Sequence, residues 1–175
     1  LGHSMGGYIL LSLAERYPRR LAAIGLICTQ AGSDSDEARA NRFKTIERIR
    51  TEGLEFIQTL MSEKLLAPDN FKSRPELSQK LKRIIGNASV EGVISALQAM
   101  ANRKNHEPTL PAIAIPALII TGSDDVLVAP EKSEWMANLL PQSRLVKMEG
   151  AGHLAMMEKP AEFNQALNEF LKSLS

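Results

Sequence analysis

A parallel α/β fold is predicted for this 175-residue chain by three features of its sequence. First, segments of strand length recur, namely "LAAIGLICT" (residues 21–29), "ALIIT" (residues 117–121) and "RLVKM" (residues 144–148). Second, segments with helical spacing lie between these strands, and such alternation favours a parallel sheet. Third, the first strand segment is a nearly continuous apolar run, which is typical of a strand buried on both faces.

The elements follow this pattern in order along the chain. A Gly-rich turn and a helix that ends at Pro18 precede the first strand. Four helical segments then occupy residues 35–103, with no strand between them. The second and third strands follow, each with a loop and a helix after it. We therefore predict a core of residues 1–34 and 104–175, and a helical unit of residues 35–103 above the sheet.

The composition disfavours several classes of protein. The 21 basic and 20 acidic residues give a formal net charge of +1, so no basic surface for nucleic acid is indicated. The apolar runs are far shorter than the roughly 20 residues that span a bilayer, so no membrane partner is expected. Cys28 is the only cysteine and lies in an apolar run, which indicates a buried thiol in a cytoplasmic protein. Because no His, Cys and carboxylate cluster has metal-ligand spacing, neither a metal nor an organic cofactor is expected.

Three kinds of polar residue stand at the ends of predicted strands. Ser4 lies in the opening turn, Asp125 and its neighbour Asp124 follow the second strand, and His153 follows the third. Because the carboxyl ends of parallel strands lie at one edge of the sheet, we expect these side chains to converge. A serine hydroxyl becomes a nucleophile when a base lies within hydrogen-bond reach and an acid orients that base. Serine, histidine and aspartate can fill these three roles.

The sequence around Ser4, "GHSMG", has the form G-x-S-x-G. Gly2, Gly6 and Gly7 supply the small neighbours that a tight strand-to-helix turn requires. Such a turn exposes the serine hydroxyl and aims the next backbone N–H at an oxyanion that forms in the reaction. The N–H of Met5 is therefore predicted to be an oxyanion donor.

Together these motifs resemble those of the α/β-hydrolase fold family. The segment "GHSMGG" resembles its nucleophile elbow, "LIITGSDDVLVAP" its acid loop, and "GAGHLAMMEKPAEFNQALNEFL" its histidine loop and final helix. The resemblance implies that Ser4 is the nucleophile, Asp125 the acid and His153 the base. The acid is assigned to Asp125 because the family's acid is usually the third residue after the glycine that corresponds to Gly122. The resemblance also implies that residues 35–103 form the family's helical cap.

The function implied by this resemblance is that of a serine hydrolase acting on a small-molecule carboxylic ester, lactone or related acyl substrate. The stretch "TQAGSDSDEARANRF" and the compact cap resemble the enol-lactonase and small carboxylesterase branches. Carbon–carbon bond hydrolases, cofactor-free haloperoxidases and acyltransferases share this style of elbow and stay as alternatives. A non-catalytic binding module on the same scaffold is another alternative, since a fold alone does not establish activity.

Several of these residues also have purely structural interpretations. These are a helix N-cap for Ser4, turn residues for Asp124 and Asp125, and a loop histidine for His153. His3 is predicted to pack near the nucleophile, and His106 to be solvated. Trp135 is predicted to pack its helix against the rest of the protein and not to stack on a substrate. Some apolar side chains of the helical unit are predicted to be mostly core, with a minority lining a substrate pocket: Phe56, Leu60, Ile94, Leu97 and Met100.

The resemblance further implies that the chain is the C-terminal portion of a longer hydrolase domain. The elbow strand is reduced to Leu1, and the earlier loop that usually supplies a second oxyanion N–H is absent. Because one lost oxyanion donor typically costs about 100- to 1,000-fold in turnover, we expect the isolated chain to be a poor catalyst. Strand 21–29 is expected to become an unprotected sheet edge that promotes self-association.

Overall fold

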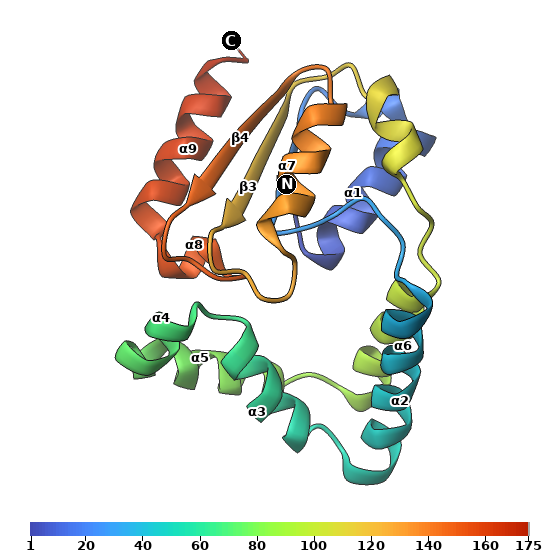
Figure 1. Ribbon diagram of the computed structural model, residues 1–175, viewed down its shortest axis with the longest axis vertical. Helices are drawn as coiled ribbons and strands as arrows, with labels where there is room; N and C mark the ends of the chain where they lie inside the picture. Colours follow the sequence, from blue (N-terminus) through green and yellow to red (C-terminus); the bar gives the residue numbers. More distant parts are fainter. Residues whose placement is uncertain (175) are drawn as a thin grey trace.

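Four parallel strands form one sheet in the computed structural model, which describes residues 1–174 (Figure 1). The strands lie side by side in their sequence order: β1 (Gly2–His3), β2 (Ile24–Ile27), β3 (Ala117–Gly122) and β4 (Ser143–Met148). Each neighbouring pair is parallel. The predicted parallel α/β fold is therefore confirmed.

Helices cover both faces of this sheet. One face carries α1 (Met5–Arg16), η2 (Glu107–Ala112) and α7 (Pro130–Leu139). The other face carries α8 (Ala155–Glu158) and α9 (Pro160–Lys172). A short helical turn, η1 (Pro18–Arg20), follows α1 and leads toward β2. The sheet is thus the middle of three layers.

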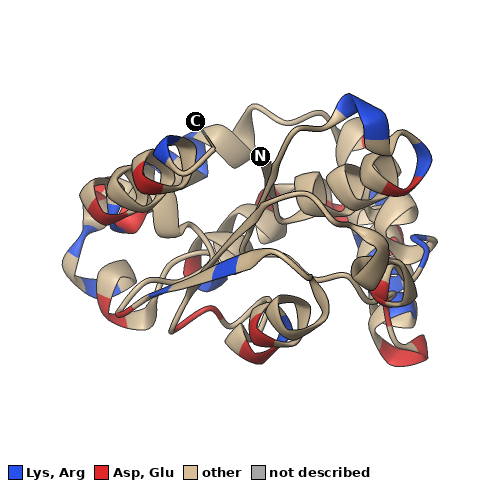
Figure 2. Ribbon diagram, turned by 90° about the horizontal axis from the view of Figure 1, so that it is seen from above, with Lys and Arg blue, Asp and Glu red and all other residues tan. Residues whose placement is uncertain are grey.

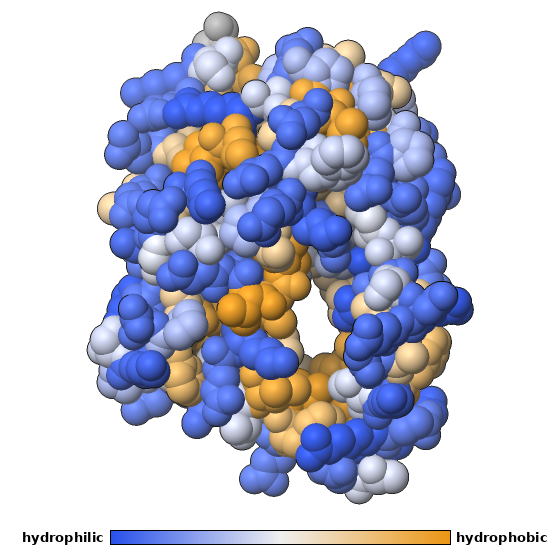
Figure 3. Space-filling view, in the orientation of Figure 1, coloured by the Kyte–Doolittle hydropathy of each residue, from blue (hydrophilic) through white to orange (hydrophobic). Residues whose placement is uncertain are grey.

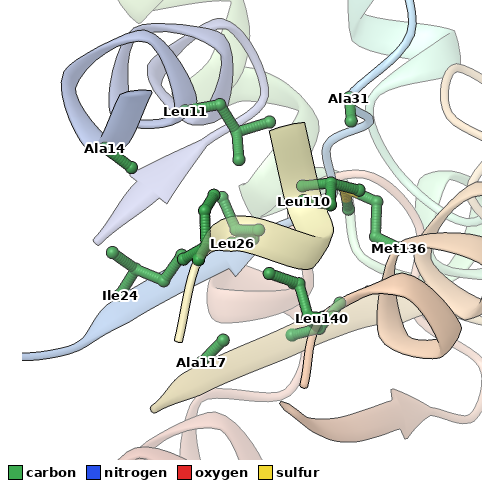
Figure 4. Close-up of a cluster of buried hydrophobic side chains, with 11 residues drawn as sticks. Leu11, Ala14, Ile24, Leu26, Ala31, Leu110, Ala117, Met136 and Leu140 are labelled. Carbon is green, nitrogen blue, oxygen red and sulfur yellow. The ribbon is translucent and has the colours of Figure 1, made fainter. Parts of the chain in front are cut away.

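Alternating side chains of β2 and β3 divide the core between the two faces. Leu26 and Ile119 belong to the cluster under α1 and α7, part of which is drawn in Figure 4. Ile27 and Ile120 belong to the cluster under α9. Because successive strand residues point to opposite faces, a strand covered on both sides must be apolar at every position. This requirement explains the continuous apolar run in the sequence.

Residues 35–103, between β2 and β3, form five α-helices, one more than predicted. They are α2 (Asp36–Glu52), α3 (Glu55–Lys64), α4 (Pro68–Ser73), α5 (Pro75–Gly86) and α6 (Val90–Ala101). The additional helix is the short α4, which begins at Pro68. A proline is suited to the first position of a helix, where no N–H donor is needed. We call residues 35–103 the helical insertion.

Contacts at two places join the helical insertion to the sheet-bearing core. Asp34 accepts hydrogen bonds from Arg42 on α2 and from Arg103 after α6. The guanidinium of Arg103 also stacks 4.4 Å from the ring centre of Tyr8 on α1. At the far end, a small apolar cluster around Leu66 reaches the residues that follow β4. Between these two places, Figure 3 shows an opening with hydrophobic residues along its border.

Two expectations about the core are wrong. The strand at 21–29 is not a sheet edge, because β1 pairs with Leu26 and Ile27 and lies outside β2. Trp135 does not pack inside, since it is 52% exposed. Helix α7 buries Ser133 and Met136 instead, which turns the indole outward. Periodicity alone did not show which side of α7 meets the sheet.

The apolar side chains expected inside the helical insertion are less buried than predicted. Leu60 is exposed, and Phe56, Ile94, Leu97 and Met100 are half-buried. The insertion packs as two separate helix pairs, α2 with α6 and α3 with α5. Each helix therefore buries only the residues that face its partner. The hydrophobic positions that it does bury include Ile46, Ile49, Ile57, Leu66, Leu77 and Leu81.

Charged residues of both signs are spread over the helices, and the two signs are interspersed (Figure 2). Within residues 1–174 no single helix has both the length and the apolar character to cross a membrane. Helices α5 and α6 meet those criteria only when taken together, as a pair bent by 96°.

The prediction of a buried thiol at Cys28 is confirmed. Its side chain is fully buried, and burial raises the pKa of the thiol to about 12, so it stays protonated at neutral pH. The φ angle of Cys28 is 43°, which lies in the left-handed region that non-glycine residues rarely adopt. Its N–H still donates to the Ile120 carbonyl at 2.8 Å. The left-handed residue therefore marks where the chain leaves the sheet.

His106 is buried rather than solvated, which corrects another expectation. It is 5% exposed, and its backbone N–H donates to the Ala31 carbonyl at 2.9 Å. Its Nδ1 atom lies 3.3 Å from a carboxylate oxygen of Glu15, without hydrogen-bond geometry. Burial lowers the pKa of His106 below its usual value of 6.5, although the Glu15 charge acts in the opposite direction. His106 is therefore largely neutral in the folded protein at neutral pH.

We predict that His106→Gln makes the free energy of unfolding less sensitive to pH. The unfolded chain protonates this histidine near its usual value of about 6.5, whereas the folded chain does so only at lower pH. Below about pH 6.5 the unfolded state therefore binds more protons than the folded state, so His106 lowers the free energy of unfolding as the pH falls. Urea unfolding at about pH 7.5 and about pH 5 should show a smaller loss of stability for His106→Gln than for the wild type. Equal losses would contradict the prediction.

Candidate active site

Ser4 lies in the turn between β1 and α1, where its backbone is held in a strained conformation. Its φ is 50° and its ψ is −116°, a combination that residues other than glycine rarely adopt. The N–H of Ser4 donates to the Ile27 carbonyl at 2.9 Å. Its carbonyl accepts from the Gly7 N–H at 2.9 Å and from the Thr29 hydroxyl at 2.8 Å. The Ser4 side chain does not cap α1, which argues against the structural alternative of an N-cap.

Two glycines permit the close packing of this turn. A Cβ atom on Gly2 would lie 2.4 Å from the Gly6 carbonyl oxygen, and one on Gly7 would lie 2.4 Å from the Thr29 hydroxyl oxygen. Both distances are too short for real carbon contacts, so the turn needs glycine at both positions. Met5 is the first residue of α1, and its N–H has no carbonyl partner within the helix. That N–H lies at the N-terminus of α1, which is the positive end of the helix dipole, and it can donate to an oxygen that gains negative charge.

Asp125 and His153 are brought together from the loops after β3 and β4. The Nδ1 atom of His153 lies 2.8 Å from the Oδ2 atom of Asp125, and both side chains are buried. The Oδ1 atom of Asp125 accepts from the N–H groups of Leu127 and Val128, each at 2.9 Å. A carboxylate beside Nδ1 requires a proton there, so a neutral His153 carries its free lone pair on Nε2. That is the tautomer that can accept a proton.

The neighbouring carboxylate, Asp124, is directed elsewhere. It is exposed, and its side chain accepts a hydrogen bond from the Ser123 hydroxyl at 3.0 Å. Its backbone N–H donates to the Ala151 carbonyl at 2.9 Å, and the Gly150 N–H donates to the Ser123 hydroxyl at 2.8 Å. These bonds fasten the loop after β3 to the loop after β4. Of the two candidate acids, Asp125 is the one that contacts His153.

His3 links the opening turn to the same loop. Its Nε2–H donates to the His153 carbonyl at 2.8 Å, and the centres of the two imidazole rings lie 4.9 Å apart. Burial lowers the pKa of His3 below its usual value, so the ring is largely neutral at neutral pH. Because Ser4 directly follows His3, this contact brings the turn and the His153 loop together. We call residues 149–154 the His153 loop.

A cavity of about 1000 Å³ lies between α1 and α6. Its lining includes Met5 and Tyr8 from α1, and Ala99 and Met100 from α6, but neither Ser4 nor His153. The cavity thus begins one residue from Ser4, on the side of the helical insertion. Within residues 1–174, no group of three or more His, Cys, Asp and Glu side chains is arranged to hold a metal ion.

Sequence reasoning missed two residues that hold this site together. Thr29 fixes the Ser4 carbonyl, and a carboxylate oxygen of Glu158 accepts from the Gly152 N–H at 2.8 Å, directly before His153. Thr29 lies two residues after β2, and Glu158 lies in a short stretch without clear periodicity. Neither position has a local pattern that predicts its partner.

Comparisons with known proteins agree with this fold. Residues 1–160 match the family described as alpha/beta hydrolase fold, and the chain belongs to that family. It is 28% identical to 3-oxoadipate enol-lactonase 2 of Acinetobacter baylyi, over 98% of this chain and 62% of the relative. It is 27% identical to a pimeloyl-[acyl-carrier protein] methyl ester esterase of Neisseria meningitidis, over 99% of this chain and 57% of the relative.

A solved structure shows a stronger likeness. The chain superposes with a TM-score of 0.94 on a thermophilic esterase from Thermogutta terrifontis, to which it is 40% identical. The match covers 99% of this chain and 64% of the esterase chain. This chain therefore spans less than two thirds of the length of these three proteins.

We predict opposite effects on stability for alanine at two adjacent glycines. Gly7→Ala must displace the Thr29 side chain and should lower the free energy of unfolding by about 1–3 kcal/mol. At Gly6 a Cβ atom would meet nothing within 4 Å, so Gly6→Ala should raise it by about 0.5–1 kcal/mol through better helix propensity. Urea unfolding of the two variants measures both effects. A loss of stability of the same size in both would contradict the role given to Thr29.

Proposed function

We propose that the protein is a serine hydrolase that cleaves a small carboxylic ester, lactone or related acyl substrate through an acyl-enzyme. The observation that carries this proposal is the buried hydrogen bond between His153 and Asp125, in a loop that His3 joins to the strained turn of Ser4. The names of the relatives support the substrate class, since they include an enol-lactonase, a methyl ester esterase and an esterase. The activity proposed is that of the intact protein.

In the first step, Ser4 Oγ attacks the carbonyl carbon of the substrate and its proton passes to Nε2 of His153. The electron pair of the carbonyl moves to its oxygen, and the Met5 N–H at the start of α1 stabilises this oxyanion. The Asp125 carboxylate stabilises the imidazolium that forms, and the N–H groups of Leu127 and Val128 hold its other oxygen in place.

In the second step, the tetrahedral intermediate collapses and the bond to the leaving oxygen breaks. His153 returns its proton to that oxygen, which leaves an acyl group on Ser4. A water molecule then gives its proton to His153 and attacks the acyl carbon, and collapse releases the acid and regenerates Ser4. With a lactone, the leaving oxygen stays attached to the acyl chain and the product is a hydroxy acid.

The helical insertion, residues 35–103, is proposed to be the cap over a core of residues 1–34 and 104–175. The support for this division is the opening between the two parts and the apolar cavity beside Met5. A cavity lined by apolar side chains such as Ile9, Leu13 and Met100 can hold an apolar acyl chain, and Arg16 and Lys104 also line it. The cytoplasmic location and self-association remain predictions.

We predict that Ser4→Ala in the intact protein abolishes hydrolysis of short p-nitrophenyl esters, with a fall of about 10⁴-fold or more in kcat. The reason is that no acyl-enzyme can form without the hydroxyl. Ser33→Ala, at an exposed serine, is the matched control and should keep full activity. Labelling with a fluorophosphonate probe should likewise be lost only in Ser4→Ala. Unchanged turnover in Ser4→Ala would refute the nucleophile and leave a binding module as the better interpretation.

We predict that Asp125→Asn lowers kcat by about 10³- to 10⁴-fold, whereas Asp124→Asn changes it by less than about twofold. The N–H groups of Leu127 and Val128 require an oxygen, so the new NH₂ group must face Nδ1 of His153. His153 would then carry its proton on Nε2 and could not accept one from Ser4. Steady-state kinetics of the two variants provide the test, and equal losses would show that the acid is wrongly assigned.

A further inference from the structure

We infer that Glu158 is a positioning residue that joins the helical insertion to the His153 loop and so sets the position of His153. The inference rests on the proposed function, in which His153 is the general base. It concerns a carboxylate that has no part in the proposed chemical steps, although it lies in the segment that follows His153.

The carboxylate of Glu158 binds both parts of the molecule at once. It stands at the end of α8 and is 3% exposed. Its Oε1 atom accepts from the Gly152 N–H at 2.8 Å, next to His153. Its Oε2 atom accepts from the Ala67 N–H at 2.8 Å and from the Asn70 side-chain amide at 2.6 Å. One oxygen therefore holds the His153 loop, and the other holds the α3–α4 junction of the helical insertion.

N–H groups, rather than a cation, satisfy this buried carboxylate. Arg74 donates to the backbone carbonyl of Glu158 at 2.8 Å, and its ion pair is with Glu76. Burying a carboxylate is costly unless hydrogen bonds replace its hydration, and the three donors from Gly152, Ala67 and Asn70 replace it here. A role in packing alone would be met more cheaply by an apolar side chain. The geometry points to a connection between two segments as the reason for a charge here.

Further hydrogen bonds join the His153 loop to the α3–α4 junction. The Asn70 amide also donates to the Gly150 carbonyl at 2.9 Å, and the Leu154 N–H donates to the Leu65 carbonyl at 3.1 Å. A Cβ atom on Gly152 would lie 2.4 Å from the Ala67 nitrogen, so the two backbones touch. The imidazole of His153 is fixed by Asp125 on the sheet side, and its backbone is fixed by the helical insertion. A movement of the α3–α4 junction would thus move the base.

Glu158→Gln tests this connection with almost no change in shape. A glutamine amide has only one acceptor oxygen. We expect this oxygen to take the place of Oε2, where the Ala67 N–H and the Asn70 amide both donate. The NH₂ group must then face the Gly152 N–H, and two donors cannot bond. The His153 loop is released while α8 and its apolar contacts remain. Glu162→Gln, at an exposed carboxylate on α9 that lies 3.7 Å from Lys159, is the matched control.

In the intact protein we expect Glu158→Gln to lower kcat about 10- to 100-fold, with KM changed by less than about twofold, because a misplaced base affects the chemical step and not substrate binding. The concentration of active sites is set by fluorophosphonate titration, so that unfolded protein does not count. Glu162→Gln should match the wild type. Asn70→Ala, at a half-exposed side chain, removes one donor from the same carboxylate and should lower kcat in the same direction by about threefold or more.

A spectroscopic readout separates this inference from the proposed function. The proton between His153 Nδ1 and Asp125 should give a resonance at low field in the ¹H NMR spectrum. That resonance should shift or broaden in Glu158→Gln and Asn70→Ala, and stay unchanged in Glu162→Gln. An unchanged resonance together with unchanged kcat per titrated site would overturn the inference, even if the variants melt at a lower temperature. If the wild type neither hydrolyses the ester nor labels at Ser4, the proposed function fails, and the resonance alone still decides the role of Glu158.

Discussion

The parallel register of the four strands is the constraint on which the rest of the structure depends. The pairing of β3 with β4 continues to the last register position, Gly122 with Met148, so the two following loops start side by side. On the other side, the Ser4 N–H extends the ladder of β2 by its bond to Ile27. Because all strands end at one edge, three distant segments meet there without any need for long connections. The apolar strands follow from the same constraint, since helices cover both faces.

The candidate site depends on conformations that local sequence does not favour. A residue such as Ser4, with positive φ, costs about 1–3 kcal/mol, and the surrounding hydrogen bonds must hold it in place. The Thr29 hydroxyl supplies one of these bonds, and it fits only because Gly7 has no side chain. On the opposite side of the site, Asp125 and Glu158 are buried carboxylates satisfied mainly by N–H donors. The site is therefore held by polar contacts from several elements, while the apolar layers only set the distance between those elements.

Much of the fold was predictable, and the errors have one physical cause. The strands at 117–121 and 144–148 were found because alternation and continuous apolar runs are local properties. His106 was misjudged because its polar surroundings in the sequence say nothing about its bond to Ala31. Trp135 was misjudged because the side of a helix that is buried depends on what the helix meets. In each case the residue's partner is distant in the chain, and composition carries no information about it.

The sequence by itself determined the order of strands and helices, the turn around Ser4, and the set of residues in which the chemistry is proposed to lie. These depend on hydrophobic period, glycine and proline, which act over a few neighbouring residues. The choice of Asp125 over Asp124 came from the spacing in the acid loop, and the structure adds the contact of Asp125 with His153. Only the tertiary structure decided that Glu158 joins the His153 loop to the helical insertion. Those contacts form between loops that are separated in sequence, so they are set by the parallel sheet and the packing above it.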